Sequence, residues 1–347
     1  MELQLINNKP AIRNELIHTD DFPFDSAEQL IEPEEETIEV VSTDKPFILA
    51  NTMVVILEEM KNQHIIPVYI KDNEVLISHT DFIEATMQIA SEVFRTETIL
   101  KPNIRVSHPI KGRIPEAKNK PANELLDHEK TLYYERMMFC IEIPTICDDI
   151  NGNKLSLTIG GVKAFNLDTL YSKKGSDEHF KIFIGFKNTV CTNLCIQTDG
   201  YSSTLKVNSI GQLKACIRSL IECFNAPYHM HGLRKLSEYS LTEKQFAQLI
   251  GRCRLYQHLP KNEQTTITPL LYGDNQLSAI CKDYYRDDSF CRAANGNINL
   301  WRLYNLLTGS NKSSYIDSFL DRSVNAYSFT EQIRWALEGK AASWYLN

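Results

Sequence analysis

The chain has 347 residues, 43% hydrophobic and 23% charged, a balance typical of globular proteins. No run approaches the roughly 18 consecutive apolar residues of a membrane-spanning helix. The first residues lack the basic-then-apolar pattern of a signal peptide. We therefore expect a cytoplasmic protein with no membrane partner, long enough for one large or two smaller compact units.

The net charge of −7 is distributed unevenly along the chain. Residues 1–60 carry a net charge of −11, residues 61–210 carry none, and residues 211–347 carry +4. The acidity is therefore confined to a leader, and the remainder is mildly basic. An acidic overall charge consequently does not exclude a nucleic-acid partner.

The charge pattern and the apolar spacing divide the chain into three parts. Residues 1–45, with the like-charge block 32–36, are expected to form a flexible acidic arm. This arm is either a solvated tail or a segment that covers a basic surface of the protein until a polyanion displaces the arm. Residues 46–210 are expected to form an α+β core domain, and residues 211–347 a helical region packed on that core.

The first half of the chain alternates between helical and strand-like spacing. Ser78 and Asp81 have the spacing of a capping box and so mark a helix start, and Asn151-Gly152 marks a hairpin turn. The cysteines, nine in all and loosely spaced, are expected to be reduced and mostly buried. The pattern predicts helices over 52–61, 78–94 and 124–130, a hairpin with strands over 65–70 and 75–77, and several strands between 133 and 187.

After residue 210 the spacing becomes helical. The segment 211–225 places Leu213, Cys216, Ile217, Leu220 and Cys223 on one face. We therefore predict an α+β fold with an antiparallel β-rich core, flanking helices and a helical C-terminal region. The later helices are expected over 241–257, 274–285, 298–307, 315–327 and 331–337.

The stretch 183–200, FIGFKNTVCTNLCIQTDG, has two interpretations. Cys191 and Cys195 have the spacing of a zinc-ligand pair, which would need a second pair of ligands. The stretch also fits a buried strand-to-turn corner, with the two cysteines as small fillers. We favour the corner and predict neither a metal nor a cofactor. The inward-facing residues would then be Val190, Leu194 and Ile196, and the second zinc pair would otherwise come from Cys216, Cys223, His229 and His231.

The segment from Arg95 to Lys120 carries seven cations and two acids, and it contains three prolines, with a fourth at position 121. Gly112 permits close backbone approach, and basic loops suit phosphate oxygens. A merely solvated basic loop is the alternative. The predicted phosphate contacts are Lys111, Arg113, Lys118 and Lys120, with Arg105 behind them.

Three other sequence patterns are weaker indications of a functional site. His79 and His108 could form a catalytic pair with Asp81, Glu74 or Glu142, but no local spacing fixes such a geometry, and we expect His79 to be exposed. Residues 308–314 lack the first glycine of a phosphate loop and follow a helix, so they are expected to link two helices, with Ser313 or Ser314 as N-cap. Aromatic residues interleaved with arginines in the C-terminal third suit single-stranded DNA but more often form core.

Seven ordered blocks of the chain carry a resemblance. They are PFILANT (46–52), KDNEVLISHTDFIEA (71–85), IRVSHPIKGRIPEA (104–117), EKTLYYERM (129–137), the stretch 183–200, FAQLIGRCRLYQ (246–257) and LWRLYNLLTGSNKSSYIDSFLDRSVNA (300–326). Together they resemble a family of uncharacterised proteins from mobile elements of anaerobic gut bacteria, and VCTNL and LYNLLTG are also similar to a wider phage/plasmid-like family. The resemblance implies a cytoplasmic protein of a conjugative element or prophage and assigns no catalytic residue.

These observations predict a non-enzymatic accessory protein of a mobile element that binds DNA, including single-stranded DNA, or anneals it. One alternative is a protein-binding inhibitor of a host defence enzyme of the anti-restriction type, in which the acidic arm imitates DNA phosphates. The other alternative is a metal-dependent enzyme.

Overall fold

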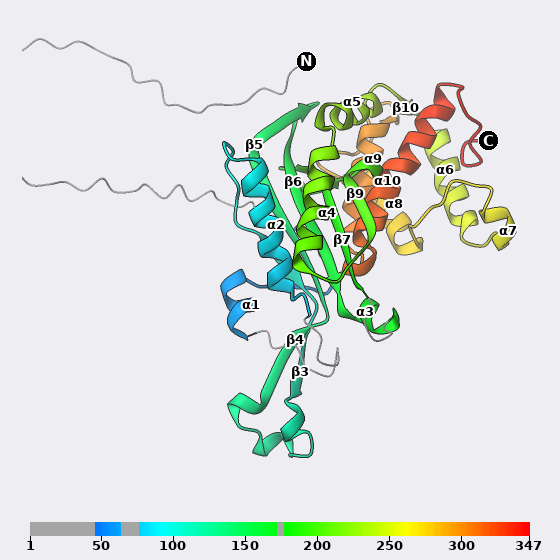
Figure 1. The fold of residues 1–347 in the computed structure, drawn as a ribbon. Coiled ribbons are helices and arrows are strands. Elements are labelled where there is room, and N and C mark those ends of the chain that lie inside the picture. Colours follow the sequence, from blue (N-terminus) through cyan, green and yellow to red (C-terminus); the bar gives the residue numbers. More distant parts are fainter. Residues whose placement is uncertain (1–45, 64–75, 172–176) are drawn as a thin grey trace, which may run out of the picture.

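An antiparallel sheet lies between two layers of helices in the computed structural model, which describes residues 46–63, 76–171 and 177–347 (Figure 1). The sheet order is β1-β2-β5-β6-β7-β8, and β9 pairs with the first half of β7. This arrangement confirms the predicted α+β fold. The strands are β1 (Met53–Val54), β2 (Asn103–Val106), β5 (Arg136–Ile150), β6 (Asn153–Ala164), β7 (Glu178–Asn188), β8 (Leu194–Cys195) and β9 (Tyr201–Val207).

Strands β5 and β6 form the centre of the sheet, and their hairpin turn is the one predicted. Asn151 and Gly152 have φ values of +52° and +80°, as a type I′ turn requires. The alternation of side chains in β5 divides the core between the two faces. Phe139 and Ile141 belong to one buried cluster, and Met138 and Cys140 to another on the opposite face.

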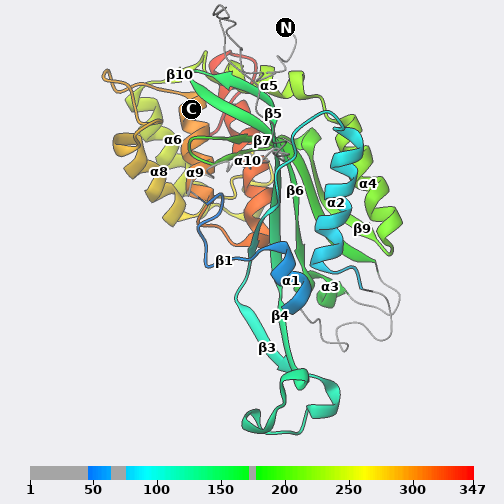
Figure 2. The same cartoon turned by 90° about the vertical axis from the view of Figure 1, so that its left-hand side faces the viewer.

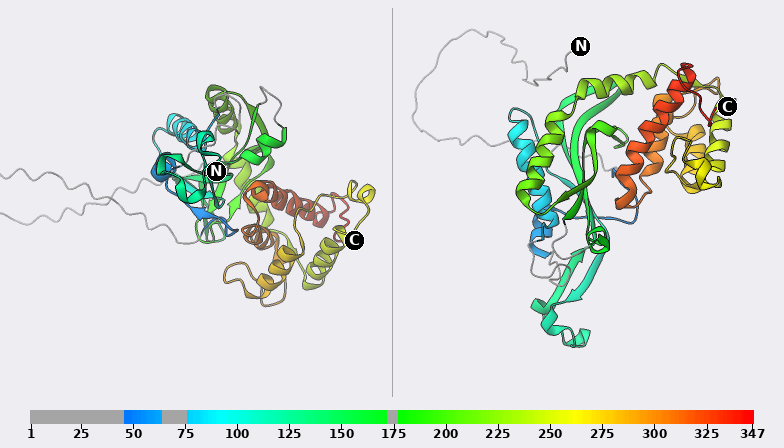
Figure 3. Two further views of the ribbon diagram at one scale, coloured as in Figure 1. Left: turned by 90° about the horizontal axis from the view of Figure 1, so that it is seen from below. Right: turned by 45° about the vertical axis from the view of Figure 1, so that its right-hand side comes forward.

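Helices α2 (His79–Val93) and α4 (Ile210–Cys223) cover one face of the sheet, as Figure 3 shows in its right-hand view. Ser78 and Asp81 form the predicted capping box at the start of α2. Phe82 then packs edge-on against Phe139, with ring centroids 5.0 Å apart. Gly161 permits this close approach, since a Cβ there would lie 2.4 Å from Cζ of Phe82.

Helix α10 (Ile316–Leu337) lies on the opposite face of the sheet, with α9 (Leu300–Asn311) beside it. Phe319 and Leu320 of α10 join the buried cluster that contains Met138. The remaining helices are α1 (Leu57–Gln63), α3 (Phe165–Tyr171), α5 (Ala226–Leu236), α6 (Glu243–Tyr256), α7 (Lys261–Gln264) and α8 (Asp274–Arg286), and β10 (Ser240–Leu241) pairs with β11 (Ile298–Asn299).

A two-stranded ribbon projects from the body, as Figures 1 and 2 show. It consists of β3 (Pro109–Arg113) and β4 (Lys130–Tyr134), which continue the lines of β2 and β5 with short breaks. Three 3-10 turns close its tip: Pro115–Ala117, Ala122–Glu124 and Asp127–Glu129. We call residues 109–134 the β-arm.

Several element predictions need correction. The helix predicted over 124–130 is wrong, because those residues form two 3-10 turns and the start of β4. One helix, α10, replaces the two predicted over 315–327 and 331–337. The predicted hairpin strand 65–70 lies outside the described residues, as does the start of its partner. Cys223 is exposed rather than on the buried face of α4, and Tyr315, not a serine, is the N-cap of α10.

Candidate functional site

The β-arm carries four of the five predicted phosphate contacts, but in different states. Lys111 and Lys118 are exposed, and neither forms an ion pair within the described part of the chain. Lys120 pairs with the buried carboxylate of Glu129, and Arg113 donates to the backbone oxygen of Lys120. Arg113 and Lys120 therefore hold the tip together, whereas Lys111 and Lys118 are exposed to solvent.

Acidic residues in the second half of the β-arm lie close to these cations. Residues 109–134 contain five lysines and arginines and four acids, so their net charge is +1. Asp127 pairs with Lys130 at 2.7 Å. The sequence segment that ends at Lys120 is more basic because three of the four acids follow it along the chain, in the 3-10 turns of the tip.

The fifth predicted contact, Arg105, lies in β2 of the main sheet and outside the β-arm. Its side chain is half-buried, its Nε has no hydrogen-bond partner among the described residues, and burial lowers the pKa of its guanidinium. Arg105 therefore lies outside the β-arm and is less exposed than Lys111 and Lys118.

A cavity of about 220 Å³ lies where the β-arm joins the body. His108, Glu135, Arg136 and Tyr315 are among its lining residues. Arg136 Nε lies 3.0 Å from a carboxylate oxygen of Asp317 at the start of α10. The cavity thus has charged walls, with its arginine already engaged by an acid.

Apolar side chains are exposed around this cavity. Tyr315 is 71% exposed and Ile110 is 38% exposed, and both line it. Residues 50–52 also line the cavity, and the apolar residues next to them in the chain are solvent-accessible as well. These are Leu49, Met53, Val54 and Ile56. The base of the β-arm therefore presents an apolar surface, which we call the arm-base surface.

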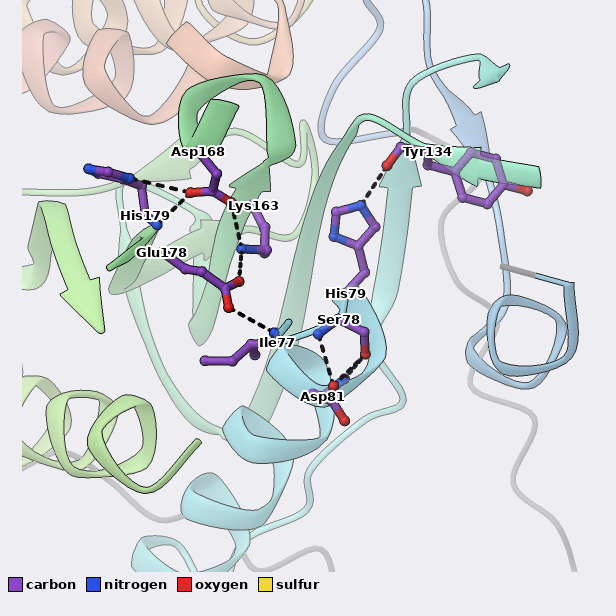
Figure 4. Close-up of polar contacts among 9 residues, drawn as sticks. All are labelled: Ile77, Ser78, His79, Asp81, Tyr134, Lys163, Asp168, Glu178 and His179. Carbon is purple, nitrogen blue, oxygen red and sulfur yellow. Dashed lines mark hydrogen bonds and ion pairs between the residues drawn. The ribbon is translucent and has the colours of Figure 1, made fainter. Parts of the chain in front are cut away.

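A buried charge cluster, which the sequence reasoning missed, lies where β6, α3 and β7 meet (Figure 4). Lys163 is fully buried, and its ammonium lies 2.6 Å from Glu178 and 3.0 Å from Asp168. Glu178 also accepts from the backbone N–H of Ile77, and Asp168 accepts from that of His179. The cluster ties Ile77, two residues before α2, to β7, so its evident role is to join elements.

The candidate catalytic residues occupy separate environments. His79 is fully buried, stacked on Phe165 with centroids 4.5 Å apart, so the expectation that it is exposed is wrong. Its Nε2 lies 2.7 Å from the backbone oxygen of Tyr134, whereas the Asp81 carboxylate is engaged by Ser78 (Figure 4). Glu142 binds Ser156 and Lys187, His108 is exposed, and Glu74 lies outside the described residues.

The stretch 183–200 runs from the end of β7 through β8 into the 3-10 turn Thr198–Gly200, and Asn193 in its loop donates to the backbone oxygen of Asn305 in α9. Leu194, Cys195 and Ile196 are buried as predicted, but Val190 is 46% exposed. Burial raises the pKa of the Cys191 and Cys195 thiols. Where the structure is described, no three His, Cys, Asp or Glu side chains gather into a group that could hold a metal ion.

Most aromatic residues of the C-terminal third belong to the core. Tyr284, Trp301 and Tyr304 are at most 1% exposed, although Tyr285 and Trp335 reach the surface. The β-arm and α6 also lie at opposite ends of the molecule in Figures 1 and 2. The C-terminal arginines of α6 and the β-arm lysines therefore do not share one face.

None of the described helices meets the length and hydropathy of a membrane span.

The fold and these sites define an α+β protein with a projecting β-arm, an apolar surface at its base and a buried lysine cluster. No curated protein and no solved structure matches the chain. A family model described as a domain of unknown function with a B. theta gene description (DUF3871) matches residues 29–346. The chain therefore belongs to this family.

Proposed function

We propose that this chain is a non-enzymatic DNA-binding accessory protein that contacts DNA with its β-arm. The projection of a two-stranded ribbon from a compact body supports the proposal most. A two-stranded β-ribbon fits the major groove of DNA, and lysines on such a ribbon contact phosphates. That the protein serves a mobile element is part of this proposal and rests on the sequence resemblance alone.

Lys111 and Lys118 are the residues expected to touch phosphates. Both are exposed and unpaired within the described chain, whereas Arg113 and Lys120 are engaged in the tip. A ligand that competed for Arg113 or Lys120 would have to disrupt the fold of the tip. The near-neutral charge of the β-arm limits the number of phosphate contacts to a few, so binding should be weak and sensitive to salt.

The burial of Trp301 and Tyr304 bears on which form of DNA is bound. Single strands are usually held by stacking on accessible aromatic side chains, and these two rings are not accessible. The geometry therefore favours duplex over single-stranded DNA, and the experiment should include both.

Fluorescence anisotropy with labelled duplex and single-stranded DNA at several salt concentrations tests the proposal. Lys111→Glu plus Lys118→Glu should abolish binding or reduce the slope of log K against log[salt] by about 1.4 for single strands and about 1.8 for duplex. Lys244→Glu plus Lys261→Glu, on exposed residues of α6 and α7, is the matched control and should leave binding unchanged. Absence of binding at low salt, or equal loss in both double variants, would refute the proposal.

A second candidate function is the inhibition of a host defence protein by direct binding, which the exposed apolar arm-base surface favours. Isolated exposed apolar residues are ordinary, but a contiguous group at one place marks a protein interface. Tyr315, at 71% exposure, would be its main anchor, since tyrosine is enriched among interface residues that contribute most to binding.

A restriction-nuclease cleavage assay separates the two functions. If the protein inhibits, then Tyr315→Asp and deletion of residues 1–45 should each relieve the inhibition. The deletion should leave DNA binding intact or strengthen it, because it removes acidic charge. Inhibition that persists in both variants would argue against this second function.

A further inference from the structure

The arm-base surface lies at an edge of the main sheet. β1 is the first strand in the sheet order, and no described strand pairs with its outer side. Val54 of β1 is 60% exposed and lies directly opposite Arg105 of β2, so the two side chains share one face of the sheet. Figure 2 shows β1 and α1 close to the point where the β-arm leaves the body. An exposed apolar group of this kind marks an interface.

Positive charge flanks this surface. Arg136 is already engaged by two acids, at 3.6 and 3.0 Å. Arg105 and Lys111 form no ion pair with any described residue, and Lys111 is exposed next to Ile110 of the cavity lining. The four acids of the β-arm all lie in the 3-10 turns of its tip, away from its base. The arm-base surface therefore suits an occupant that is both apolar and acidic.

The described chain starts beside this surface, where backbone contacts fix its position. The backbone oxygen of Pro46 accepts from the hydroxyl of Thr192 in the β7–β8 loop at 3.0 Å. The N–H groups of Leu49 and Ala50 both donate to the backbone oxygen of Lys312 at the end of α9. Leu49 and its successors then build the surface. The segment that precedes Pro46 is therefore attached within a few residues of the arm-base surface.

Residues 29–45 combine the two properties that this surface suits. They carry six acids and one lysine, a net charge of −5, together with five aliphatic residues. Ile38 and Val40 alternate with Glu39, which is the sequence pattern of a strand with one apolar face. The family match begins at residue 29, so the matched domain includes this segment although the described chain starts only at residue 46.

Covalent attachment favours this segment over a separate partner. Its 17 residues can span about 60 Å at most when extended, so every part of the arm-base surface close to the attachment point is within reach. The effective concentration of a segment tethered in this way is roughly millimolar. Contacts that are too weak to retain a separate protein can therefore still retain this segment.

We propose that residues 29–45 of the same chain cover the arm-base surface. Their aliphatic side chains pack on Val54 and Tyr315, and their glutamates face Arg105 and Lys111. A second copy of the chain and another protein are the alternative occupants, and the experiments below distinguish them. Because Lys111 is also a proposed phosphate contact, the segment and DNA would compete for it. That consequence alone rests on the proposed function, and the experiments use no DNA.

Zero-length carbodiimide cross-linking of the full chain, followed by peptide mass spectrometry, tests the charge contact. A cross-link between Lys111 and a carboxylate of residues 32–39 is expected, because the reagent joins only groups that are in contact. Lys111→Arg keeps the charge but removes the reactive amine, so it should abolish this cross-link. A mixture of 15N-labelled and unlabelled chains shows whether the link lies within one chain. Absence of the link, or a link only between copies, would count against the proposal.

Amide hydrogen exchange of the full chain tests the apolar contact. Exchange of residues 37–42 should be about tenfold or more slower than in a synthetic peptide of residues 29–45. Val54→Asp plus Tyr315→Asp, on two exposed residues of the surface, should restore the exchange rate of the peptide. Leu255→Asp plus Tyr228→Asp, on equally exposed residues of α6 and α5, is the matched control and should not.

Circular dichroism of both double variants shows whether they are folded. Exchange at the rate of the peptide in the unmodified chain would overturn the proposal and leave the arm-base surface to another protein. Equal acceleration of exchange in the two double variants would overturn it as well, because the effect would then not depend on this surface.

Discussion

Replacement of Lys163 by methionine should destabilise the protein strongly. Lys163 is fully buried, pairs with Asp168 and Glu178, and lies 4.1 Å from the centroid of the Phe180 ring. The methionine would keep much of the apolar contact but leave two carboxylates without their cation, one of them only 1% exposed. Removal of one partner from a buried ion pair costs about 3–5 kcal/mol, so the midpoint of thermal unfolding should fall by roughly 10 °C.

The second carboxylate provides the internal test. The double variant Lys163→Met plus Glu178→Gln removes the fully buried negative charge while it keeps an acceptor for the N–H of Ile77. It should therefore recover part of the lost stability, since replacement of a whole buried pair is often neutral. Lys154→Met, an exposed lysine in the same strand, should change the midpoint little, because exposed side chains rarely contribute more than about 0.5 kcal/mol.

Thermal and urea unfolding at neutral pH would measure these variants. A loss below about 1 kcal/mol for Lys163→Met, or no recovery in the double variant, would refute the view that the cluster is a buried charge balance that joins α3 and β7.

Two further predictions concern Gly161 in β6 and His229 in α5. Gly161→Val should cost more than about 3 kcal/mol in urea unfolding, because a Cβ there would lie 2.4 Å from Phe82; an unchanged unfolding midpoint would show that the helix can shift. His229 is fully buried, and burial lowers its pKa to about 3, so its neutral form stabilises the fold above the unfolded pKa of about 6.5, and that stability is lost as the pH falls from there toward 3. Between pH 7.5 and 5 the free energy of unfolding should therefore fall by about 2 kcal/mol more in the native protein than in His229→Phe; equal pH profiles would contradict this account.

Local signals in the sequence were sufficient for several parts of the fold. Asn151-Gly152 identifies a hairpin because only a turn with positive φ suits that pair. Ser78 and Asp81 identify the start of α2 because their side chains satisfy N–H groups within the same turn. In both cases the determining interactions lie within a few residues, so no knowledge of the tertiary structure is needed.

The charge balance of the β-arm and the buried cluster around Lys163 could not be predicted from the sequence, because in both cases the partners lie further along the chain. The acids that neutralise the basic segment of the β-arm come mainly from the 3-10 turns of the tip, after that segment ends at Lys120, and their pairing with its lysines is seen only in the folded tip. The partners of Lys163 come from α3 and β7. A signal did exist, because a lysine inside the apolar run LTIGGVKAF requires either exposure or a buried counter-charge, but the sequence does not show which carboxylate supplies it.

The paired strands of the β-arm also bear on how such a protein can diversify. Because β3 and β4 extend β2 and β5 almost without interruption, matched insertions in both strands would lengthen the ribbon by about 3.3 Å per residue pair. Insertions of two pairs would preserve which face each side chain occupies. Such insertions would not alter the packing of the helices on the main sheet. The length of the β-arm can therefore vary while the sheet and its helices stay the same.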